Sequence, residues 1–246
     1  MIKIRIRFRK YGNMKFIGHL DVMRYFQKAI RRAEIHIRYS GGFSPHQIMS
    51  FAAPLGVGLT SNGEYVDIEL TDDVAPSDLK ERLNAQMAEG FEVTDCFLLP
   101  EDAQNAMSIV AAADYVCIPR AGSGSEDAEC FIRDLAAFFE QPQVMITKKT
   151  KRGEKKMDLK PLIYELSPRM EADGPVLFLK ISNGSAANVK PELVLDAYYA
   201  SIGEERPAFA WMYRREEVYA DQASSEEQEK GVHRFIPLGE LGERIG

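Results

Sequence analysis

The chain of 246 residues carries 31 Lys and Arg against 37 Asp and Glu, a net charge of −6, and 45% of its residues are hydrophobic. This composition is typical of globular proteins, and no apolar run reaches the roughly 18 residues of a membrane span. Cys96, Cys117 and Cys130 are too widely spaced for a CxxC metal site or a disulfide framework, so we expect reduced thiols in a cytoplasmic protein.

Positive charge is concentrated in two stretches. Residues 1–50 carry a net charge of +9 and residues 143–160 a net charge of +5, which leaves −20 for the rest of the chain. Such segregation predicts a basic surface on an acidic body, and a basic surface attracts polyanions even when the whole protein is negative.

The first half of the chain has the order β-α-β-β-α-β. Residues 2–8 alternate apolar and basic side chains, as a half-buried strand does and a signal peptide does not. The other expected elements are a helix from His19, strands at 35–39 and 65–70 separated by an Asn62-Gly63 turn, a helix from Pro76 to about Glu89, and a strand at 91–99. This order predicts a ferredoxin-like domain over residues 1–100.

The second half repeats the order with an extra hairpin near Gly153. The expected elements are strands at 115–119, 144–147, 157–166, 176–181 and 209–219, and helices at 126–140 and 190–201. We therefore expect an α+β protein of two tandem ferredoxin-like domains with antiparallel sheets, 1–100 and 112–221, with the helices of each on one face. Residues 222–246 are expected to form an acidic, mobile tail, in which Phe235–Leu238 can dock as an extended segment.

Gly18-His19-Leu20-Asp21 begins the first expected helix. His19 and Asp21 are candidates for a general base with its orienting carboxylate, or for metal ligands. Residues two apart do not face each other on a regular helix, however. The structural interpretation, in which Asp21 favours the helix dipole and His19 meets a backbone group, is the stronger one. We expect no metal and no cofactor.

The loop Tyr39-Ser40-Gly41-Gly42-Phe43-Ser44-Pro45-His46 is a second candidate site. Paired glycines allow backbone N–H groups to approach a phosphate, and Tyr39 and Phe43 offer stacking surfaces. Ser44 adds a hydroxyl and His46 an imidazole, but the GK[ST] ending of a Walker A loop is missing. The alternative is a strand connection that needs positive φ. We expect this loop and His19 to lie in one cleft.

Two clusters of cations are candidates for nucleic-acid binding. One lies on a face of the first helix and comprises Arg24, Lys28, Arg31 and Arg32; the other surrounds Gly153 and comprises Lys148, Lys149, Lys151, Arg152, Lys155 and Lys156. Cations crowded on a hairpin repel one another, and a bound RNA backbone would relieve that repulsion. The alternative is a solvated hairpin tip. No general acid/base pair accompanies the cluster.

The N-terminal motifs resemble the radical-SAM-linked bacterial domain of unknown function, which occurs alone or fused behind a radical SAM protein. The matching residues are Arg5, Phe8, Lys10 and Gly12, then Phe16-Ile17-Gly18-His19-Leu20-Asp21, Ala29-Ile30-Arg31-Arg32-Ala33, Tyr39 to His46, Ser50-Phe51 and Pro54-Leu55-Gly56-Val57-Gly58. Residues 147–161 and Lys190-Pro191-Glu192 look similar too. The CxxxCxxC triplet of radical SAM proteins is absent from this sequence, so the resemblance implies a radical SAM partner in trans.

Three functions remain open from the sequence. The first is an accessory protein that binds RNA or a ribonucleoprotein and acts with the radical SAM partner. The second is a metal-independent endoribonuclease with His19 or His46 as general base. The tandem fold has a distant similarity to the CRISPR repeat-processing endoribonucleases of the RAMP superfamily, which supplies no activity. The third is a protein-interaction scaffold without nucleic-acid binding.

Overall fold

The computed structural model describes residues 2–71, 76–120, 127–150, 153–185 and 187–245. The chain divides into two compact units, one formed by residues 1–111 and 215–246 and the other by residues 112–214. Each unit contains helices and an antiparallel sheet, so the expected α+β class is confirmed. None of the described helices combines the length and apolarity needed to cross a membrane.

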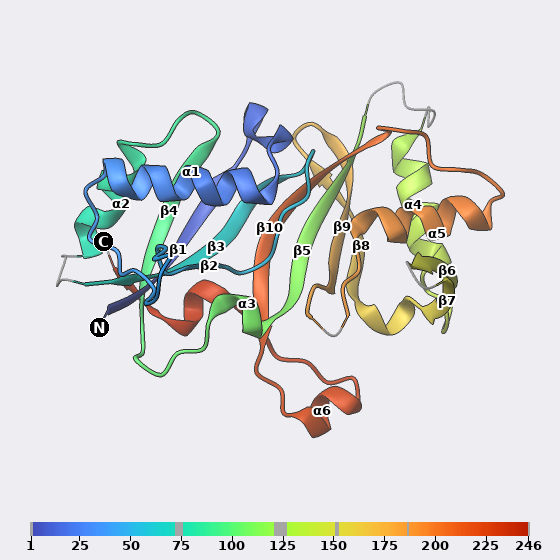
Figure 1. Ribbon diagram of the computed structural model, residues 1–246. Coiled ribbons are helices and arrows are strands. Elements are labelled where there is room, and N and C mark those ends of the chain that lie inside the picture. The colour runs from blue at the N-terminus through green and yellow to red at the C-terminus, as the bar shows by residue number, and fades with distance from the viewer. Residues whose placement is uncertain (1, 72–75, 121–126, 151–152, 186, 246) are drawn as a thin grey trace. The chain divides into compact units, whose positions relative to one another are not determined.

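The first unit has the split βαβ topology. Its elements are β1 (Ile2–Lys10), a 3-10 turn (Gly12–Phe16), α1 (His19–Arg32), β2 (Met49–Phe51), β3 (Thr60–Leu70), α2 (Pro76–Asn84) and β4 (Phe91–Leu99). Strand β1 pairs antiparallel with both β3 and β4, and β2 pairs with β3, which gives the ferredoxin-like order β4-β1-β3-β2. Helices α1 and α2 cover the same face of this sheet (Figure 1).

The alternation in β1 separates an apolar face from a basic one. Ile4, Ile6 and Phe8 are buried beneath α1, and the rings of Phe8 and Phe26 lie 4.6 Å apart. Arg5 points to the opposite face, where its guanidinium donates to both oxygens of Asp67, at 2.8 and 2.9 Å. The sheet is therefore lined by a hydrophobic core on one side and by paired charges on the other.

The second unit repeats the topology. Its elements are β5 (Val110–Pro119), which follows the short α3 (Ala106–Ile109), then α4 (Ala128–Phe138), β8 (Ile163–Glu171) after a 3-10 turn (Lys160–Leu162), β9 (Gly174–Ser182) and α5 (Pro191–Ser201). Strand β10 (Trp211–Asp221) begins in this unit, and its residues from Arg215 onward belong to the first. The strand order of the second unit within the ten-stranded sheet, β10-β5-β9-β8, is again the ferredoxin-like order. The inserted β6 (Met145–Thr150) and β7 (Gly153–Asp158) pair only with each other among the described strands.

The end of the chain differs from the expected tail. Beyond β10 the structure contains α6 (Ser225–Glu229), β11 (Phe235–Pro237), a 3-10 turn (Leu238–Leu241) and β12 (Glu243–Ile245). Strand β11 docks on β10, as expected for an extended segment, but β12 also pairs with β4, and Leu238 is fully buried. Strands of three residues are too short to leave a periodic pattern in the sequence, which is why they were not predicted.

Two local expectations in the first unit were wrong. Residues 35–39 form no strand but only isolated bridges, from Ile37 to Leu70 and from Tyr39 to Gln47. The Asn62-Gly63 pair lies inside β3 rather than in a turn. Its glycine is needed because the backbone of Glu216 and Glu217 in β10 comes so close that a side chain would collide with it.

Candidate nucleic-acid interface

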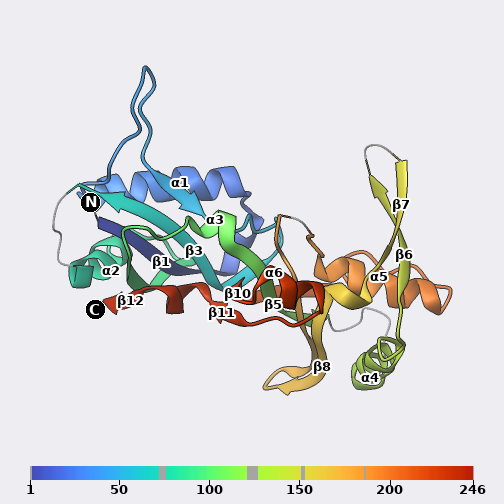
Figure 2. The same cartoon turned by 90° about the horizontal axis from the view of Figure 1, so that it is seen from below.

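The hairpin β6–β7 places like charges opposite one another. Lys148 is in register with Lys155 in its ladder, whereas Lys149 is in register with Glu154. Like charges directly opposite destabilise a strand pair, and an isolated two-stranded hairpin is marginal in water. Figure 2 shows the hairpin extending beyond α4 and α5. Lys156 is exposed, whereas Lys151 and Arg152 lie outside the described residues.

The base of the hairpin is anchored in the second unit. The carboxylate of Asp158 accepts from the backbone N–H groups of Val144 and Lys160, at 2.9 and 3.0 Å, and Leu159 is fully buried. An open groove of about 640 Å³ runs beside this base, between β6 and α5. The cationic ladder is therefore held out from a fixed base.

The second basic cluster lies on α1, where all four cations are exposed. Arg24 pairs with Asp21 at 3.3 Å, and Arg32 donates to the carbonyl of Gln86 at 2.8 Å. Within the described part of the chain, neither Lys28 nor Arg31 has an ion-pair partner. Exposed pairs such as Arg24–Asp21 contribute little, so most of this positive charge remains available to an anion.

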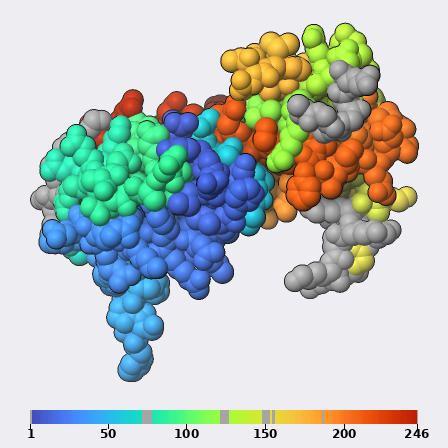
Figure 3. Space-filling view, turned by 90° about the horizontal axis from the view of Figure 1, so that it is seen from above, coloured from blue at the N-terminus to red at the C-terminus, as the bar shows by residue number. Residues whose placement is uncertain are grey.

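The loop 39–46 projects from the first unit (Figures 2 and 3). The Ser40 N–H donates to the His46 carbonyl at 2.8 Å, and the Ser40 hydroxyl lies 2.8 Å from Nδ1 of His46. Gly42 has φ +98°, a conformation that favours glycine. The structural interpretation of the loop, a connection that needs positive φ, therefore applies to this residue. Phe43 at the tip is fully exposed and Tyr39 is half exposed. Ser44 is exposed as well.

The base of this loop meets α1 beside the basic face. Nε2 of Gln47 donates to the backbone carbonyl of Gln27 at 3.5 Å. Arg24 and Arg31 lie three residues before and four after Gln27, so they share its side of the helix. The exposed aromatic ring at the loop tip and the cations of α1 therefore belong to one region of the first unit.

His19 and His46 line separate hollows, so the structure does not bring them together in one cleft. His19 lines a narrow pocket with Lys10, Phe51 and Glu64, and its ring lies edge-on to that of Phe51 at 5.5 Å. His46 lines a larger pocket at the other end of β2. Asp21 pairs with Arg24 instead of His19, so the base-and-orienter pair considered from the sequence does not form.

The pocket of His19 contains buried ions that were not predicted. The carboxylate of Glu64 accepts twice from Nη1 of Arg215, at 3.1 Å each, and the ammonium of Lys10 donates to the carbonyl of Ile17 at 3.0 Å. Burial raises the pKa of Glu64, although Arg215 and Lys10 oppose the shift. Burial also lowers the pKa of His19, and the charge of Lys10 adds to that effect. The burial of Lys10 could have been predicted from the sequence. In the two-residue alternation of β1, position 10 falls on the same inward face as Ile6 and Phe8.

Two of the three cysteines are buried as expected of structural thiols, whereas Cys130 is partly exposed. Cys96 and Cys117 are fully buried, and burial raises the pKa of Cys96 to about 12. Among the residues that the structure describes, no group of three or more His, Cys, Asp or Glu side chains is arranged to hold a metal ion.

Comparison with protein families gives one match. The profile of the family described as "Uncharacterized protein conserved in bacteria (DUF2344)" matches residues 3–191, which is most of the chain. No curated protein matches the chain.

Comparison with solved structures shows a weak similarity. A chain in the crystal structure of a Cbf5-Nop10-Gar1 complex superposes with a TM-score of 0.48 at 9% sequence identity. The superposition covers 87% of this chain and 48% of that one, so this chain spans about half the length of its structural neighbour.

Proposed function

The chain belongs to the bacterial family DUF2344, and we propose that it is an RNA- or ribonucleoprotein-binding accessory protein that acts with a radical SAM partner supplied in trans. The observation that carries the RNA-binding part is the register of β6–β7, which pairs Lys148 with Lys155 on a hairpin outside the ten-stranded sheet. A bound phosphate backbone offsets this repulsion and gains counterion release.

The exposed cations of α1 and the loop 39–46 support the same proposal. Their charges provide phosphate contacts, which position RNA without reading its sequence. Phe43 and Tyr39 provide ring faces on which unpaired bases stack, and each such contact contributes about 1–3 kcal/mol. Sequence preference, where the protein has one, then comes from the loop, whereas affinity comes from the cations.

The radical SAM part of the proposal rests on the resemblance of the N-terminal motifs, which cluster around α1 and the loop 39–46. We place the proposed contact surface for the partner at the exposed motif residues of α1 and of the loop 39–46. Co-purification of the partner with the wild-type chain, and its loss in a Phe43→Ala variant, is the expected result. Co-purification unchanged by Phe43→Ala would contradict this placement.

A filter-binding titration of single-stranded RNA tests the RNA part. Between about 50 and 300 mM salt, log affinity falls with log salt concentration by about 0.7 for each phosphate neutralised. The triple variant Lys148→Glu, Lys149→Glu, Lys151→Glu lowers affinity for all sequences alike, because it removes backbone contacts. The variant Phe43→Ala instead reduces the differences between sequences.

A matched control reverses three positive charges outside the two basic clusters. Arg133, Lys190 and Lys230 are exposed and lie outside both basic clusters. Reversing these three to Glu changes the net charge equally, and we expect a much smaller loss of affinity. Equal losses in the two triple variants would show that net charge alone attracts RNA. Absence of RNA binding at low salt would favour the protein-interaction scaffold, and cleaved RNA would favour the endoribonuclease.

A further inference from the structure

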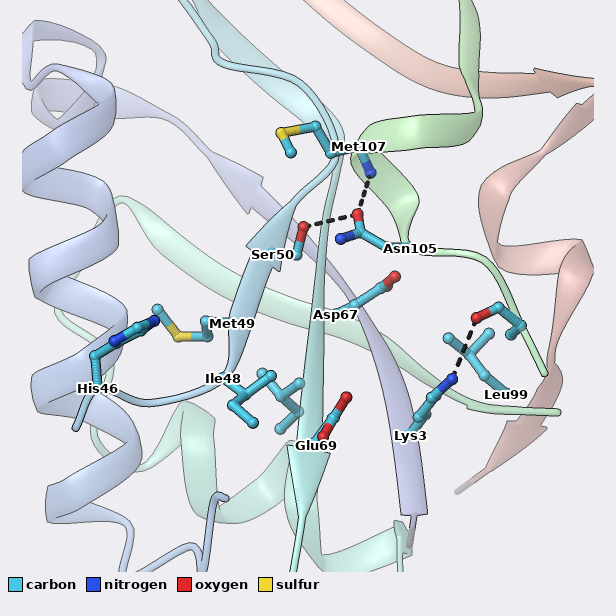
Figure 4. Close-up of a pocket in the computed structure, with 12 residues that line it drawn as sticks. Lys3, His46, Ile48, Met49, Ser50, Asp67, Glu69, Leu99, Asn105 and Met107 are labelled. Atoms are coloured by element: carbon cyan, nitrogen blue, oxygen red, sulfur yellow. Dashed lines mark hydrogen bonds between the residues drawn. The ribbon is translucent and has the colours of Figure 1, made fainter. Parts of the chain in front are cut away.

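A pocket of about 370 Å³ lies in the first unit, on the face of the sheet opposite α1. Its walls come from β2, from β3 and from the segment that leads into α3 (Figure 4). Ile48, Met49, Leu99 and Met107 supply the apolar surface, and Ser50, Asp67, Glu69 and Asn105 supply polar atoms. This size and mixture are typical of small-molecule sites, which combine apolar walls with a few converging polar groups.

Some polar groups of the pocket keep unused hydrogen-bonding capacity. Oδ1 of Asn105 accepts from the Ser50 hydroxyl at 2.8 Å and from the Met107 N–H at 2.9 Å. Within the described residues, the amide NH₂ of Asn105 has no partner. Glu69 accepts from Arg38 through Oε2 only, at 3.0 Å, and Oε1 has no partner within the same residues. The pocket therefore offers one amide donor and one carboxylate acceptor.

The remaining charged groups limit the ligands that fit. Asp67 is occupied by Arg5 and by the N–H of Ala106, and Lys3 donates to the carbonyls of Glu101 and Ala103. Each carboxylate that lines the pocket is therefore already paired with an arginine, and the Lys3 ammonium is held by two carbonyls. A flat, uncharged ring with both donors and acceptors on its edge does fit between the apolar walls.

We propose that this pocket binds a nucleobase that carries an exocyclic amino group. The amino group donates to Oε1 of Glu69, and a ring nitrogen or carbonyl of the base accepts from the amide of Asn105. The ring lies against Ile48 and Leu99, and the sugar and phosphate remain outside. Adenine, cytosine and guanine satisfy this pattern, whereas uracil lacks the amino group. The site is separate from the β6–β7 hairpin and does not depend on it.

Calorimetric titration of the full chain with adenosine, cytidine, guanosine and uridine, in turn, measures the affinity for each nucleoside and tests the proposal. We expect at least one amino-bearing nucleoside to bind about tenfold or more tightly than uridine, as a hydrogen bond to a charged group implies. Glu69→Gln and Asn105→Asp are each expected to lower that affinity about tenfold. Asp remains a good N-cap, so Asn105→Asp preserves the start of α3.

The matched control is Glu92→Gln, which makes the same change at a half-exposed pair with Arg9 away from the pocket. We expect it to bind nucleosides like the wild type. The proposal is overturned when no nucleoside binds at millimolar concentration, or when Glu69→Gln and Asn105→Asp both bind like the control.

Two further experiments show whether the bound nucleobase belongs to RNA or to a free nucleoside or nucleotide. Competition between single-stranded RNA and the nucleoside shows that the base belongs to RNA, whereas simultaneous binding shows that a free nucleoside or nucleotide is the ligand; both outcomes support the pocket. The triple reversal on the hairpin is expected to weaken RNA binding and to leave nucleoside binding intact. Failure of RNA binding with intact nucleoside binding would therefore contradict the proposed function and not the pocket.

Discussion

At the residue scale, Gly63 shows how closely β3 and β10 approach in the first unit. A Cβ at this position would collide with the carbonyl oxygen of Glu216 and lie 3.2 Å from Cα of Glu217, both backbone atoms that cannot turn away. We expect Gly63→Ala to lower the free energy of unfolding by about 1–3 kcal/mol, because overpacking must be relieved by a backbone shift. Chemical denaturation measures the change.

The control for this prediction is Gly56→Ala. A Cβ at Gly56 meets only the end of the Leu59 side chain, at 3.5 Å, which is ordinary contact. Its free energy of unfolding should stay within about 0.5 kcal/mol of the wild type. Equal effects of the two substitutions would mean that the loss of glycine flexibility, rather than the approach of β10, governs Gly63.

His19 gives a prediction about pH. Its pKa lies below the usual value, through burial first and the charge of Lys10 second. The unfolded chain therefore binds a proton at this residue more readily, and stability falls as pH decreases through about 6.5. We expect His19→Gln to flatten this part of the stability profile between about pH 7.5 and 5.5. Glu64 lines the same pocket and is present in both the wild type and His19→Gln. Its own contribution to the pH dependence of stability is therefore the same in both and does not affect the difference between them.

The control is His46→Gln, because His46 is exposed and, among the described residues, forms its hydrogen bonds with Ser40. Its stability profile should follow that of the wild type. A His19→Gln profile parallel to the wild type across this range would show that the imidazole does not lose its proton on folding.

Single residues also show why part of the site escaped prediction. Exposed cations such as Lys28 and Arg31 were recognisable, because charge and helical spacing are local properties of the sequence. The nucleobase pocket was not, because Ser50, Glu69 and Asn105 meet only when β2, β3 and the segment before α3 fold together. Glu64 and Arg215 are 151 positions apart, and no local pattern joins them.

At the scale of elements, the hairpin β6–β7 couples stability and binding with opposite signs. Lys155 stands opposite Lys148, so Lys155→Glu replaces a repulsive cross-strand pair with an attractive one. We expect stability to rise by about 0.2–1 kcal/mol, as cross-strand pairs contribute. RNA affinity is expected to fall, because a phosphate contact is replaced by a negative charge. Thermal unfolding and filter binding of the same variant measure both quantities.

A gain in both stability and affinity, or a loss of both, would contradict this account of the hairpin. The control is Lys155→Thr, which removes the repulsion without introducing a negative charge. It should retain part of the stabilisation and lose less affinity than Lys155→Glu.

Most elements were predictable because their patterns are local. The two-residue alternation in β1 and the helical stripe of α1 located both elements within a few residues. The β-α-β-β-α-β order, which occurs twice in the sequence, predicted the ferredoxin-like topology of both units. Short edge elements were missed or misplaced, as at residues 35–39 and in β12, because tertiary contacts rather than propensity decide them.

At the scale of the whole molecule, the chain returns to its first unit at the C-terminus. Strand β12 pairs with β4, and the carbonyl of buried Leu238 accepts from Nη1 of Arg5 at 3.0 Å. A chain ended after Asp221 loses these contacts, and the burial of Leu238 alone contributes about 1.5–3 kcal/mol. We expect faster amide hydrogen exchange in β1 and β4 of the truncated chain, while β9 of the second unit keeps its protection.

The control keeps the full length and disrupts only α6, whose residues are not buried. Glycine substitutions at Ser225 and Glu229 weaken that helix by about 1 kcal/mol or less each, and exchange in β4 should not change. If the truncated chain also kept wild-type protection in β4, the C-terminal residues would act as a mobile tail, as the sequence predicted. Loss of protection in β1 and β4 but not in β9 would instead show that β12 and Leu238 complete the first unit, so that residues far apart in the sequence form a single folding unit.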